Sequence, residues 1–360
     1  MFDIHQAFRR SLQNPEIAYP LAAIIALTEL IENSDAGTMF ELVNAIRQGA
    51  ETLKSKLENP IGVDAGCELF IAFVTLFHHE SLTLTDLKRE LIRQGQKYAE
   101  EAMTYRKKIA ELTVGFIKDG SVILTHSHSR VVMQTLLLAH QHKRISVFVT
   151  EARPRGLGFV RIALSLVTLI HNNLHISLKT AEALIAAGVP CTVVLDSAVA
   201  YVMDKVDFVL VGSEAVVESG GLVNAVGSNQ IAIIARAAKK PFYALAESYK
   251  FHRLFPLSQY DLPSHNSKIL SFSSPSRPTR SASISRPAED TTTASDPPTA
   301  SASTNDTEPT SSTSITQQQI CKTNPHVDYT RPDLISLVFS DVGSLTPEGV
   351  SQYLVGMFAG

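Results

Sequence analysis

The chain has 360 residues, of which 44% are hydrophobic, so it can bury a substantial core in one large domain or two. Its 32 basic and 35 acidic residues give a formal net charge of -3, which excludes an extended positively charged surface for binding phosphate backbones. We therefore expect no direct nucleic-acid binding. The three cysteines, Cys67, Cys191 and Cys321, lie far apart and outside any Cys-x-x-Cys or Cys/His spacing, which favours a reducing compartment.

Residues 1–118 show helical periods and no strand-like alternation. The first ten residues carry charge and no long apolar stretch, so they do not resemble a secretory signal, and we expect a cytoplasmic protein. From Met39 to Leu57 apolar residues recur at three- and four-residue steps, and Thr38 with Glu41 forms a capping box before them. Further helices are predicted over 67–77 and 85–117. The sequence therefore predicts a helical domain, built as a bundle, over residues 1–118.

After Gly120 short apolar, β-branched runs alternate with helical stretches, which is typical of a parallel sheet with crossover helices. The predicted strands are 122–124, 145–149, 192–195, 208–211, 242–246 and 335–339. The predicted helices are 130–142, 181–187, 230–239 and one that begins near Thr346, where a proline follows the capping hydroxyl. The predicted fold class is α/β: an N-terminal helical bundle followed by a Rossmann-like parallel-sheet domain over residues 119–360.

Two segments interrupt this alternation. Residues 264–319 are dominated by Ser, Thr, Pro and Ala, so they cannot bury enough surface to fold, and we predict a disordered insertion, either a plain linker or a phosphorylated one. Residues 158–178 lengthen the connection between the second and third strands. Their apolar run, 159–169, contains Arg161 and is shorter than the roughly 20 residues of a membrane span, so we expect no membrane insertion.

Polar residues follow nearly every predicted strand, at the sheet edge where open parallel sheets bind ligands. The candidate ligand-binding residues are Thr125, His126, Ser127, Ser129, Arg130, Asp196, Glu214, Asn224, Asn229 and Lys250. Donors, cations and carboxylates at one edge fit a pocket for a sugar phosphate or a nucleotide, and a helix that begins at Ser129 favours an anion. The structural alternative is that Thr125 and Ser129 cap this helix and that Glu214 pairs with Arg130. Spacing alone leaves both interpretations open.

Metal binding and nucleophilic catalysis have weaker support. His126 and His128 alternate across an extended segment and no third ligand is evident in the sequence, so no metal site is predicted. A nucleophile needs a neighbouring base or a depressed pKa, and none of the cysteines falls in the loops after the strands. Cys67 and Cys191 are predicted to be small core residues.

Several distinctive motifs occur in order along the chain. They are ILTHSHSRVV at 123–132, VLDSAV at 194–199, VGSEAVVESGG at 211–221, FYALAESYKF at 242–251 and RLFPL at 253–257, together with 106–110, 328–330 and 339–347. With these motifs the chain resembles the alpha, regulatory subunits of eukaryotic translation initiation factor 2B. The resemblance covers nearly the whole chain apart from the two interruptions. Relatives pass quickly from the second strand to the next helix, so 158–178 is either a lineage-specific loop or translated intron sequence.

The resemblance implies a non-catalytic regulatory role. Alpha subunits form a homodimer that joins two copies of the other subunits of this guanine-nucleotide exchange factor, beta and delta among them, into a decamer. They help the complex to detect initiation factor 2 phosphorylated on its own alpha subunit, which slows translation under stress. Residues 334–339 and the tail to Gly360 resemble the dimerisation region. No cofactor is implied, beyond a sugar phosphate or nucleoside monophosphate in the pocket.

The same superfamily contains the methylthioribose-1-phosphate and ribose-1,5-bisphosphate isomerases, so the alternative function is a sugar-phosphate aldose-ketose isomerase. The resemblance places the catalytic cysteine of those enzymes at Ser127 and their catalytic aspartate at Glu214. Their phosphate-side Asn-Lys pair falls on Asn224 and Ala225. The chain thus differs from the isomerases at three functional positions, Ser127, Glu214 and Ala225, and we predict a degenerate site with no catalytic residue.

Overall fold

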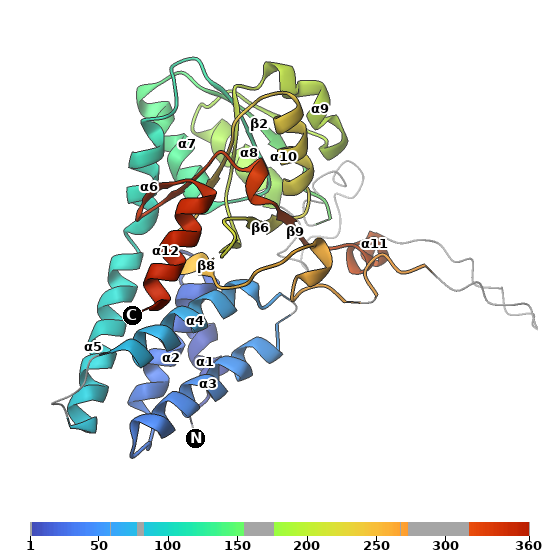
Figure 1. Cartoon of the computed structure of the whole chain (residues 1–360). Coiled ribbons are helices and arrows are strands. Elements are labelled where there is room, and N and C mark those ends of the chain that lie inside the picture. The colour runs from blue at the N-terminus through green and yellow to red at the C-terminus, as the bar shows by residue number, and fades with distance from the viewer. Residues whose placement is uncertain are drawn as a thin grey trace, which may run out of the picture.

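The computed structural model describes residues 2–57, 59–77, 83–154, 176–266, 268–272 and 317–359. Its first part is helical, as predicted, and all but the last of its helices form the lower half of the molecule in Figure 1. The helices are α1 (Ile4–Ser11), α2 (Tyr19–Glu32), α3 (Met39–Ser55), α4 (Ile61–Leu76), α5 (Leu84–Ala102) and α6 (Tyr105–Val114). The capping box of α3 is confirmed, since the Thr38 side chain accepts from the Glu41 amide and the Glu41 carboxylate accepts from the Thr38 amide.

Helix α2 is central to the bundle and packs closely against two neighbours. A Cβ atom on Gly66 of α4 would lie 2.3 Å from the carbonyl oxygen of Pro20, and one on Gly95 of α5 would lie 2.5 Å from Thr28 Oγ1. Only a residue without a side chain allows α4 and α5 to approach α2 so closely. The bundle core is aliphatic around this crossing, with Leu21, Leu27 and Leu91 fully buried.

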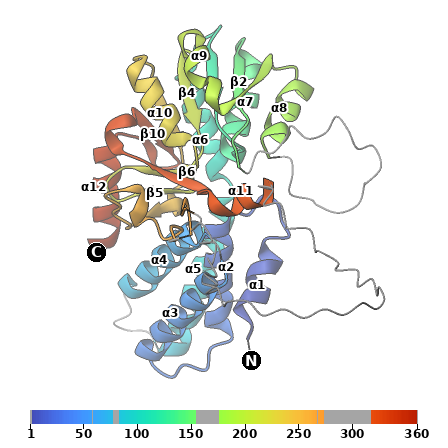
Figure 2. The same cartoon turned by 90° about the vertical axis from the view of Figure 1, so that its right-hand side faces the viewer.

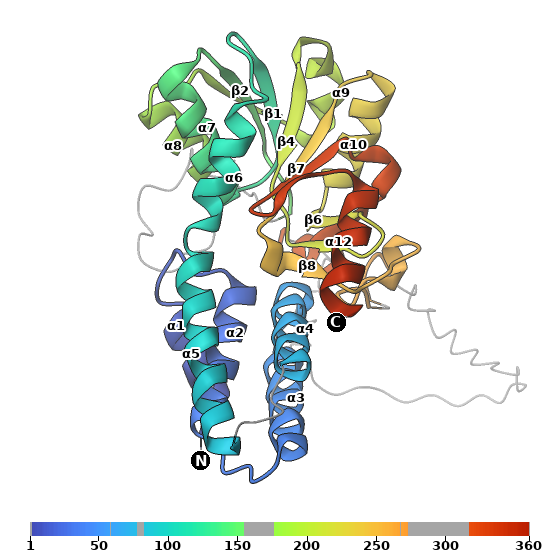
Figure 3. The same cartoon turned by 60° about the vertical axis from the view of Figure 1, so that its left-hand side comes forward.

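The prediction of a single long helix over 85–117 is wrong, because the helix is interrupted between α5 and α6. The amides of Met103 and Thr104 bond to carbonyls only three residues back, and the Thr104 hydroxyl donates to the Glu101 carbonyl at 2.7 Å. Such a tightened turn ends an α-helix. Helix α6 then runs up onto the sheet domain and packs on α7 (Arg130–His142), as Figure 3 shows.

The second part of the chain is built on a seven-stranded sheet with strand order β11-β10-β7-β4-β1-β2-β3. The strands are β1 (Val122–Thr125), β2 (Ser146–Thr150), β3 (Cys191–Val194), β4 (Phe208–Val211), β7 (Phe242–Leu245), β10 (Leu337–Ser340) and β11 (Gly343–Leu345). The first six of these pair in parallel, and β11 joins β10 antiparallel at one edge. All six predicted strands are confirmed within two residues at each end, and the α/β fold class is correct.

Helices cover both faces of this sheet, which is why its strands read as continuous apolar runs. One face packs against α6, α7 and α8 (Ile176–Ala186), and the other against α9 (Val199–Val202), α10 (Ser228–Ala237) and α12 (Pro347–Ala359). Figure 2 shows α7 and α8 on one side and α10 and α12 on the other. The carboxyl ends of the strands point toward the helical bundle.

A second sheet, which the sequence did not predict, lies between the main sheet and the bundle (Figure 1). Its order is β8 (Phe251–His252), β5 (Ala215–Val217), β6 (Leu222–Ala225) and β9 (Val327–Thr330). Strands β5 and β6 form a hairpin whose turn contains Gly220 at φ +80°, a left-handed conformation that favours glycine. Ile61 of α4 belongs to the apolar cluster of this small sheet, so the sheet joins the two parts of the chain.

The two predicted interruptions are only partly within the described residues. Helix α11 (Gln317–Thr323) begins inside the predicted insertion 264–319, so the predicted end of the insertion at 319 is too late. Residues 273–316 of this insertion lie outside the described part of the chain. Helix α8 begins at Ile176, inside the predicted segment 158–178, whose residues up to 175 are likewise not described. Among the helices of the described ranges, none combines the length and apolarity needed to cross a membrane.

Candidate functional site

The predicted site residues gather at the carboxyl edge of the main sheet, but several of them are committed to structural contacts. His126, which follows β1, is buried, and its ring nitrogens lie 2.6 Å from Thr150 Oγ1 and 2.9 Å from the carbonyl oxygen of Val226. Burial lowers the pKa of this imidazole. A Cβ on Gly227 would lie 2.9 Å from the ring. His126 therefore ties β1, β2 and the start of α10 together.

The turn between β1 and α7 carries Ser127, His128 and Ser129. Ser127 has φ +62°, in the left-handed region, and its carbonyl accepts from Thr180 Oγ1 at 3.3 Å. Nδ1 of His128 lies 2.9 Å from the same hydroxyl. Burial, with Lys179 and Arg130 adding to it, lowers the pKa of His128 to about 4. This imidazole is consequently neutral near pH 7.

Helix α7 begins at this turn without a side-chain cap. Ser129 is its N-cap residue, but its side chain makes no capping hydrogen bond within the described part of the chain. The Ser129 hydroxyl instead packs on Gly212, where a Cβ would lie 2.2 Å from Oγ. Thr125 is a buried residue of β1. The capping alternative is therefore wrong for Ser129, and the amides of the first turn of α7 face the sheet edge without this side chain.

Arg130 and Glu214 were predicted to form an ion pair in the structural alternative to ligand binding, but each of them contacts a different partner. Arg130 donates through Nη1 to the carbonyl oxygens of Pro15 and, at 3.2 Å, of Ile17, both in the loop between α1 and α2. Glu214 Oε2 accepts from Asn59 Nδ2 at 3.4 Å. Both contacts reach across to the helical domain, so residues of the sheet edge also hold the two parts of the chain together.

Asp196, Asn224 and Asn229 also have defined local contacts. The Asp196 carboxylate accepts the amides of Ala152 and Arg153 at 2.9 and 2.8 Å, which fixes the loop after β2. Asn224 donates to Ser228 Oγ at 2.9 Å within the same β6–α10 segment. The Asn229 side chain is half-buried at the first turn of α10.

Asp328, on β9, is a site residue that the sequence did not single out. Its Oδ2 accepts the amides of Gly227 and Asn229 at 2.7 and 3.0 Å, so its carboxylate already occupies the N-terminus of α10. Its Oδ1 is buried and has no hydrogen-bond partner among the described residues. Burial raises the pKa of Asp328 to about 7. In the sequence, the Asp-Tyr-Thr motif at 328–330 was the signal that pointed to Asp328. Its position beside α10 follows only from the pairing of β6 with β9.

Lys250 belongs to a buried charge network that crosses between the two parts of the chain. Its Nζ lies 2.7 Å from Glu247 Oε2 and donates to the carbonyl oxygen of Ser213 at 2.9 Å. Arg106 of α6 donates through Nε to Glu247 Oε1 at 3.0 Å. Burial alone would raise the pKa of Glu247, but Lys250 and Arg106 lower it to about 2. Glu247 therefore stays ionised and fixes both cations.

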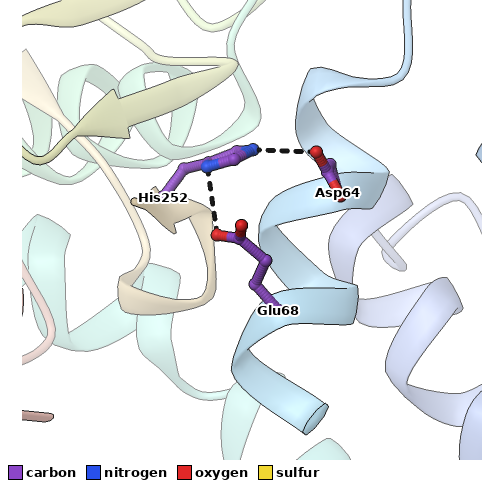
Figure 4. Close-up of side chains that lie close together, drawn as sticks. All are labelled: Asp64, Glu68 and His252. Atoms are coloured by element: carbon purple, nitrogen blue, oxygen red, sulfur yellow. Dashed lines mark ion pairs between the residues drawn. The ribbon is translucent and has the colours of Figure 1, made fainter. Parts of the chain in front are cut away.

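A second charge cluster joins α4 to β8 (Figure 4). Nε2 of His252 lies 3.3 Å from Asp64 Oδ2, and Nδ1 lies 3.2 Å from Glu68 Oε2. Metal ligands converge on one point, whereas these two carboxylates approach opposite nitrogens of one ring. Lys54 also lies 2.9 Å from Asp64 Oδ1, where it supplies a positive charge. The geometry fits a protonated imidazole between two carboxylates better than a metal centre.

A cavity of about 350 Å³ lies away from this chemistry, between α2, α4, α5 and α12. Its wall is mostly apolar and includes Ile24, Phe70, Phe73 and Met357. Its titratable lining residues, Lys97, Tyr98 and Glu101, all come from α5, whereas the polar groups of the sheet edge come from several elements. The sheet edge remains the candidate site, because specificity needs convergent polar groups.

Residues 12–347 match the Initiation factor 2 subunit family. The chain belongs to this family. Translation initiation factor eIF2B subunit alpha of Dictyostelium discoideum is 35% identical over 346 residues, which cover 95% of this chain and 92% of that protein. Ribose 1,5-bisphosphate isomerase of Archaeoglobus fulgidus is 31% identical over 207 residues, 57% of this chain and 58% of the isomerase.

The fold comparison agrees with this family. A chain of the tetrameric eIF2B-beta2-delta2 complex from C. thermophilum is similar at a TM-score of 0.65 with 15% sequence identity, over 98% of this chain and 92% of that chain. At this identity the likeness concerns the fold alone. The helical first part and the mostly parallel sheet are thus features of initiation factor 2 subunit folds.

In this member of the initiation factor 2 subunit family, the cysteines lie away from the turn after β1. Cys67 is buried in α4, where burial raises the pKa of its thiol to about 12. Cys191 begins β3, at the strand end opposite the site, and burial raises its pKa to about 11. Cys321 Sγ lies 3.7 Å from the carbonyl oxygen of Pro154. The predicted core position is confirmed for Cys67, whereas Cys191 is only half-buried at the margin of the sheet core.

Proposed function

We propose that the chain is a regulatory, non-catalytic subunit of the translation initiation factor 2B guanine-nucleotide exchange complex. The observation that carries the proposal is the pair Ser127 and Glu214, which stands where the resemblance places the catalytic cysteine and aspartate of the isomerases. The similarity to an eIF2B alpha subunit over almost the whole chain, against little more than half for an isomerase, supports the same conclusion.

Within the described residues, neither of the two histidines that flank Ser127 is placed to act as its base. A serine nucleophile needs a base within hydrogen-bond reach, because its hydroxyl does not ionise near neutrality. His126 uses both of its ring nitrogens in bonds to Thr150 and Val226. His128 directs Nδ1 to Thr180, and its lowered pKa of about 4 makes it a weak base. Neither imidazole is equipped to take a proton from Ser127.

Glu214 is also poorly suited to replace an aspartate. Its side chain is longer by one methylene, which displaces the carboxylate by on the order of 1 Å, and misplacement on that scale costs about 100-fold in rate. Oε2 is moreover held by Asn59, a residue of the helical domain. These two features add to the loss of the thiol and favour a degenerate active site over the isomerase alternative.

The pocket at the sheet edge is proposed to bind a sugar phosphate or a nucleoside monophosphate. The first turn of α7, without a side-chain cap, offers amides to an anion, and Arg130 lies at the start of this helix. The N-terminus of α10 is less available, since Asp328 occupies it. Asn224 in β6, Asn229 in the first turn of α10 and Lys250 after β7 would line the opposite side.

The partners are proposed from the relatives. We expect a homodimer that bridges two sets of beta and delta subunits into a decamer, in the cytoplasm, and that helps to sense initiation factor 2 phosphorylated on its alpha subunit. An edge strand, β11, and apolar side chains around it support the dimer: Phe116 is 47% exposed and lies against Phe339, and Val342 is 39% exposed.

Turnover and binding assays on the full-length protein test the proposal. We expect no conversion of ribose 1,5-bisphosphate or methylthioribose-1-phosphate above a heat-killed control, and measurable calorimetric binding of at least one sugar phosphate or nucleoside monophosphate. Arg130→Ala removes a charge-assisted contact and should weaken that binding about tenfold. Turnover by the wild type would overturn the non-catalytic assignment and establish the isomerase alternative, whereas absence of binding would refute the pocket.

A further inference from the structure

The loop between α1 and α2, residues 13–18, is held against the site by two arginines. Arg106 donates to both parts of Glu16, with Nη1 2.7 Å from the carboxylate and Nη2 2.6 Å from the carbonyl oxygen. Arg130 donates to the carbonyl oxygens of Pro15 and Ile17 on either side. Three consecutive residues of one loop thus face two guanidinium groups, one from α6 and one from the first turn of α7.

The two guanidinium groups lie close enough to repel one another. Burial lowers the pKa of Arg130, and the positive charge of Arg106 lowers it further, whereas Glu247 and Glu16 oppose this effect. Glu247 is buried and is already paired with Lys250 as well as with Arg106. The network therefore holds three cations, Arg106, Arg130 and Lys250, against one buried carboxylate and the carboxylate of Glu16.

Glu16 is the weak member of this network. Its side chain is 62% exposed, whereas that of Arg106 is 7% exposed. An ion pair with an exposed partner is worth little, because water competes for the carboxylate and fixing a long side chain costs entropy. The carbonyl contacts to Arg130 are carried by the same short loop. A phosphate dianion would offer these two arginines more charge and better bidentate geometry than the loop does.

We propose that the α1–α2 loop is an exchangeable cover, and that Arg106 and Arg130 together form an anion site that the loop occupies until a phosphorylated ligand displaces it. The inference rests on the proposed ligand pocket and adds to it a second binding residue, Arg106, and a moving segment. Ligand binding then loosens a contact between the helical domain and α7, which connects pocket occupancy to the way the two parts of the chain are joined.

Glu16→Gln tests the exchange, because it keeps the size of the side chain and removes the competing charge. Calorimetric titration of the full-length protein with ribose 1,5-bisphosphate should give a dissociation constant about two- to fivefold lower than that of the wild type. Glu32→Gln is the matched control, since Glu32 is an exposed acidic residue at the other end of α2, and its affinity should equal that of the wild type.

A fluorescent reporter follows the loop directly. The chain contains no tryptophan, so Gln13→Trp at an exposed position of the loop supplies a single one. Its emission should shift on addition of ribose 1,5-bisphosphate, as the loop leaves the arginines. Arg106→Lys keeps a positive charge but loses the forked contact, so in this reporter background the shift should need a higher ligand concentration.

The outcomes separate the two proposals. If the wild type binds none of the sugar phosphates and nucleoside monophosphates, the pocket itself is refuted, and the exchange with it; if another of these compounds binds and ribose 1,5-bisphosphate does not, that compound takes its place in the titrations. If the wild type binds but Glu16→Gln leaves the affinity unchanged or weakens it, the pocket stands and the exchange is overturned. A reporter emission that stays constant while calorimetry shows saturation would likewise overturn the exchange, because the loop would then not move.

Discussion

Replacing His252 with glutamine removes the positive charge that links β8 to α4. The ring is 3% exposed, and it lies between Asp64 and Glu68 in the cluster of Figure 4. Burial opposes protonation of this imidazole, but the hydrogen bonds and charges of the two carboxylates outweigh it and raise the pKa of His252 from 6.5 to about 9. The proton on this ring therefore stabilises the folded chain.

The sign and size of this effect follow from linkage. Because the folded-state pKa lies above the unfolded one, the stabilisation is fully present below pH 6.5 and is lost as the pH rises through about 9. A shift of this size corresponds to about 3 kcal/mol. Glu68 is 37% exposed, so solvent screening reduces the expected contribution to about 2 kcal/mol. The Leu254 amide lies 3.0 Å from Nδ1 and can donate a hydrogen bond to this nitrogen when the ring is neutral. This bond further reduces the stability that is lost when the ring loses its proton.

Urea unfolding at a fixed protein concentration, from about pH 6 to about pH 9.5, measures this contribution. We expect His252→Gln to lower the unfolding midpoint clearly at the acidic end and to approach the wild type at the alkaline end. His142→Gln, at an exposed position of α7, is the matched control and should follow the wild type throughout. Parallel curves for the wild type and His252→Gln across the whole range would refute the bridging role of the charged ring.

Three other predictions concern the packing, the thiols and the insertion. Gly66→Ala forces a Cβ to within 2.3 Å of the Pro20 carbonyl oxygen and should lower the free energy of unfolding by about 1 to 3 kcal/mol; an unchanged urea midpoint would contradict the close approach of α2 and α4. Cys67, which is buried and has a thiol pKa of about 12, should resist alkylation at pH 8 in the folded protein and react after unfolding, and half-buried Cys191 should react faster than Cys67; rapid labelling of Cys67 in the native chain, located by peptide mapping, would contradict its burial. Deletion of residues 273–314 should leave a soluble protein with an unchanged unfolding midpoint, since a long insertion adds only a logarithmic loop-closure cost; aggregation of the deletion variant would show that these residues contribute to the fold.

The main sheet was predictable because each of its strands is an apolar run bounded by turn residues, and the covering helices have clear periods. The small sheet was not, because β5, β6 and β8 are short, and the segment from Gly212 to Ala225 that contains β5 and β6 resembles the polar loops of a ligand site. Its strands come from separate parts of the chain, and β9 pairs with β6 across about one hundred residues. Local pattern carries no information on pairing at that distance.

The candidate site was predicted as a set of residues but not as a set of contacts. The rule that ligands bind at the carboxyl ends of parallel strands selected His126, Ser129 and Lys250, which follow β1 and β7. Whether an imidazole is free or bonded depends on partners such as Thr150, which the sequence presents only as a strand residue. The sequence places Arg106 in the 106–110 motif but assigns it no role, because its contacts to Glu16 and Glu247 join three distant segments.

We infer that this chain acts as a subunit of an initiation factor 2B complex. Purification of the epitope-tagged protein from its own cells at low ionic strength, with the co-purifying chains identified by mass spectrometry, tests it most directly. We expect the beta and delta subunits of initiation factor 2B in comparable amounts, together with guanine-nucleotide exchange activity in the same fraction. Recovery of the chain without other subunits, in a fraction that converts ribose 1,5-bisphosphate, would contradict it.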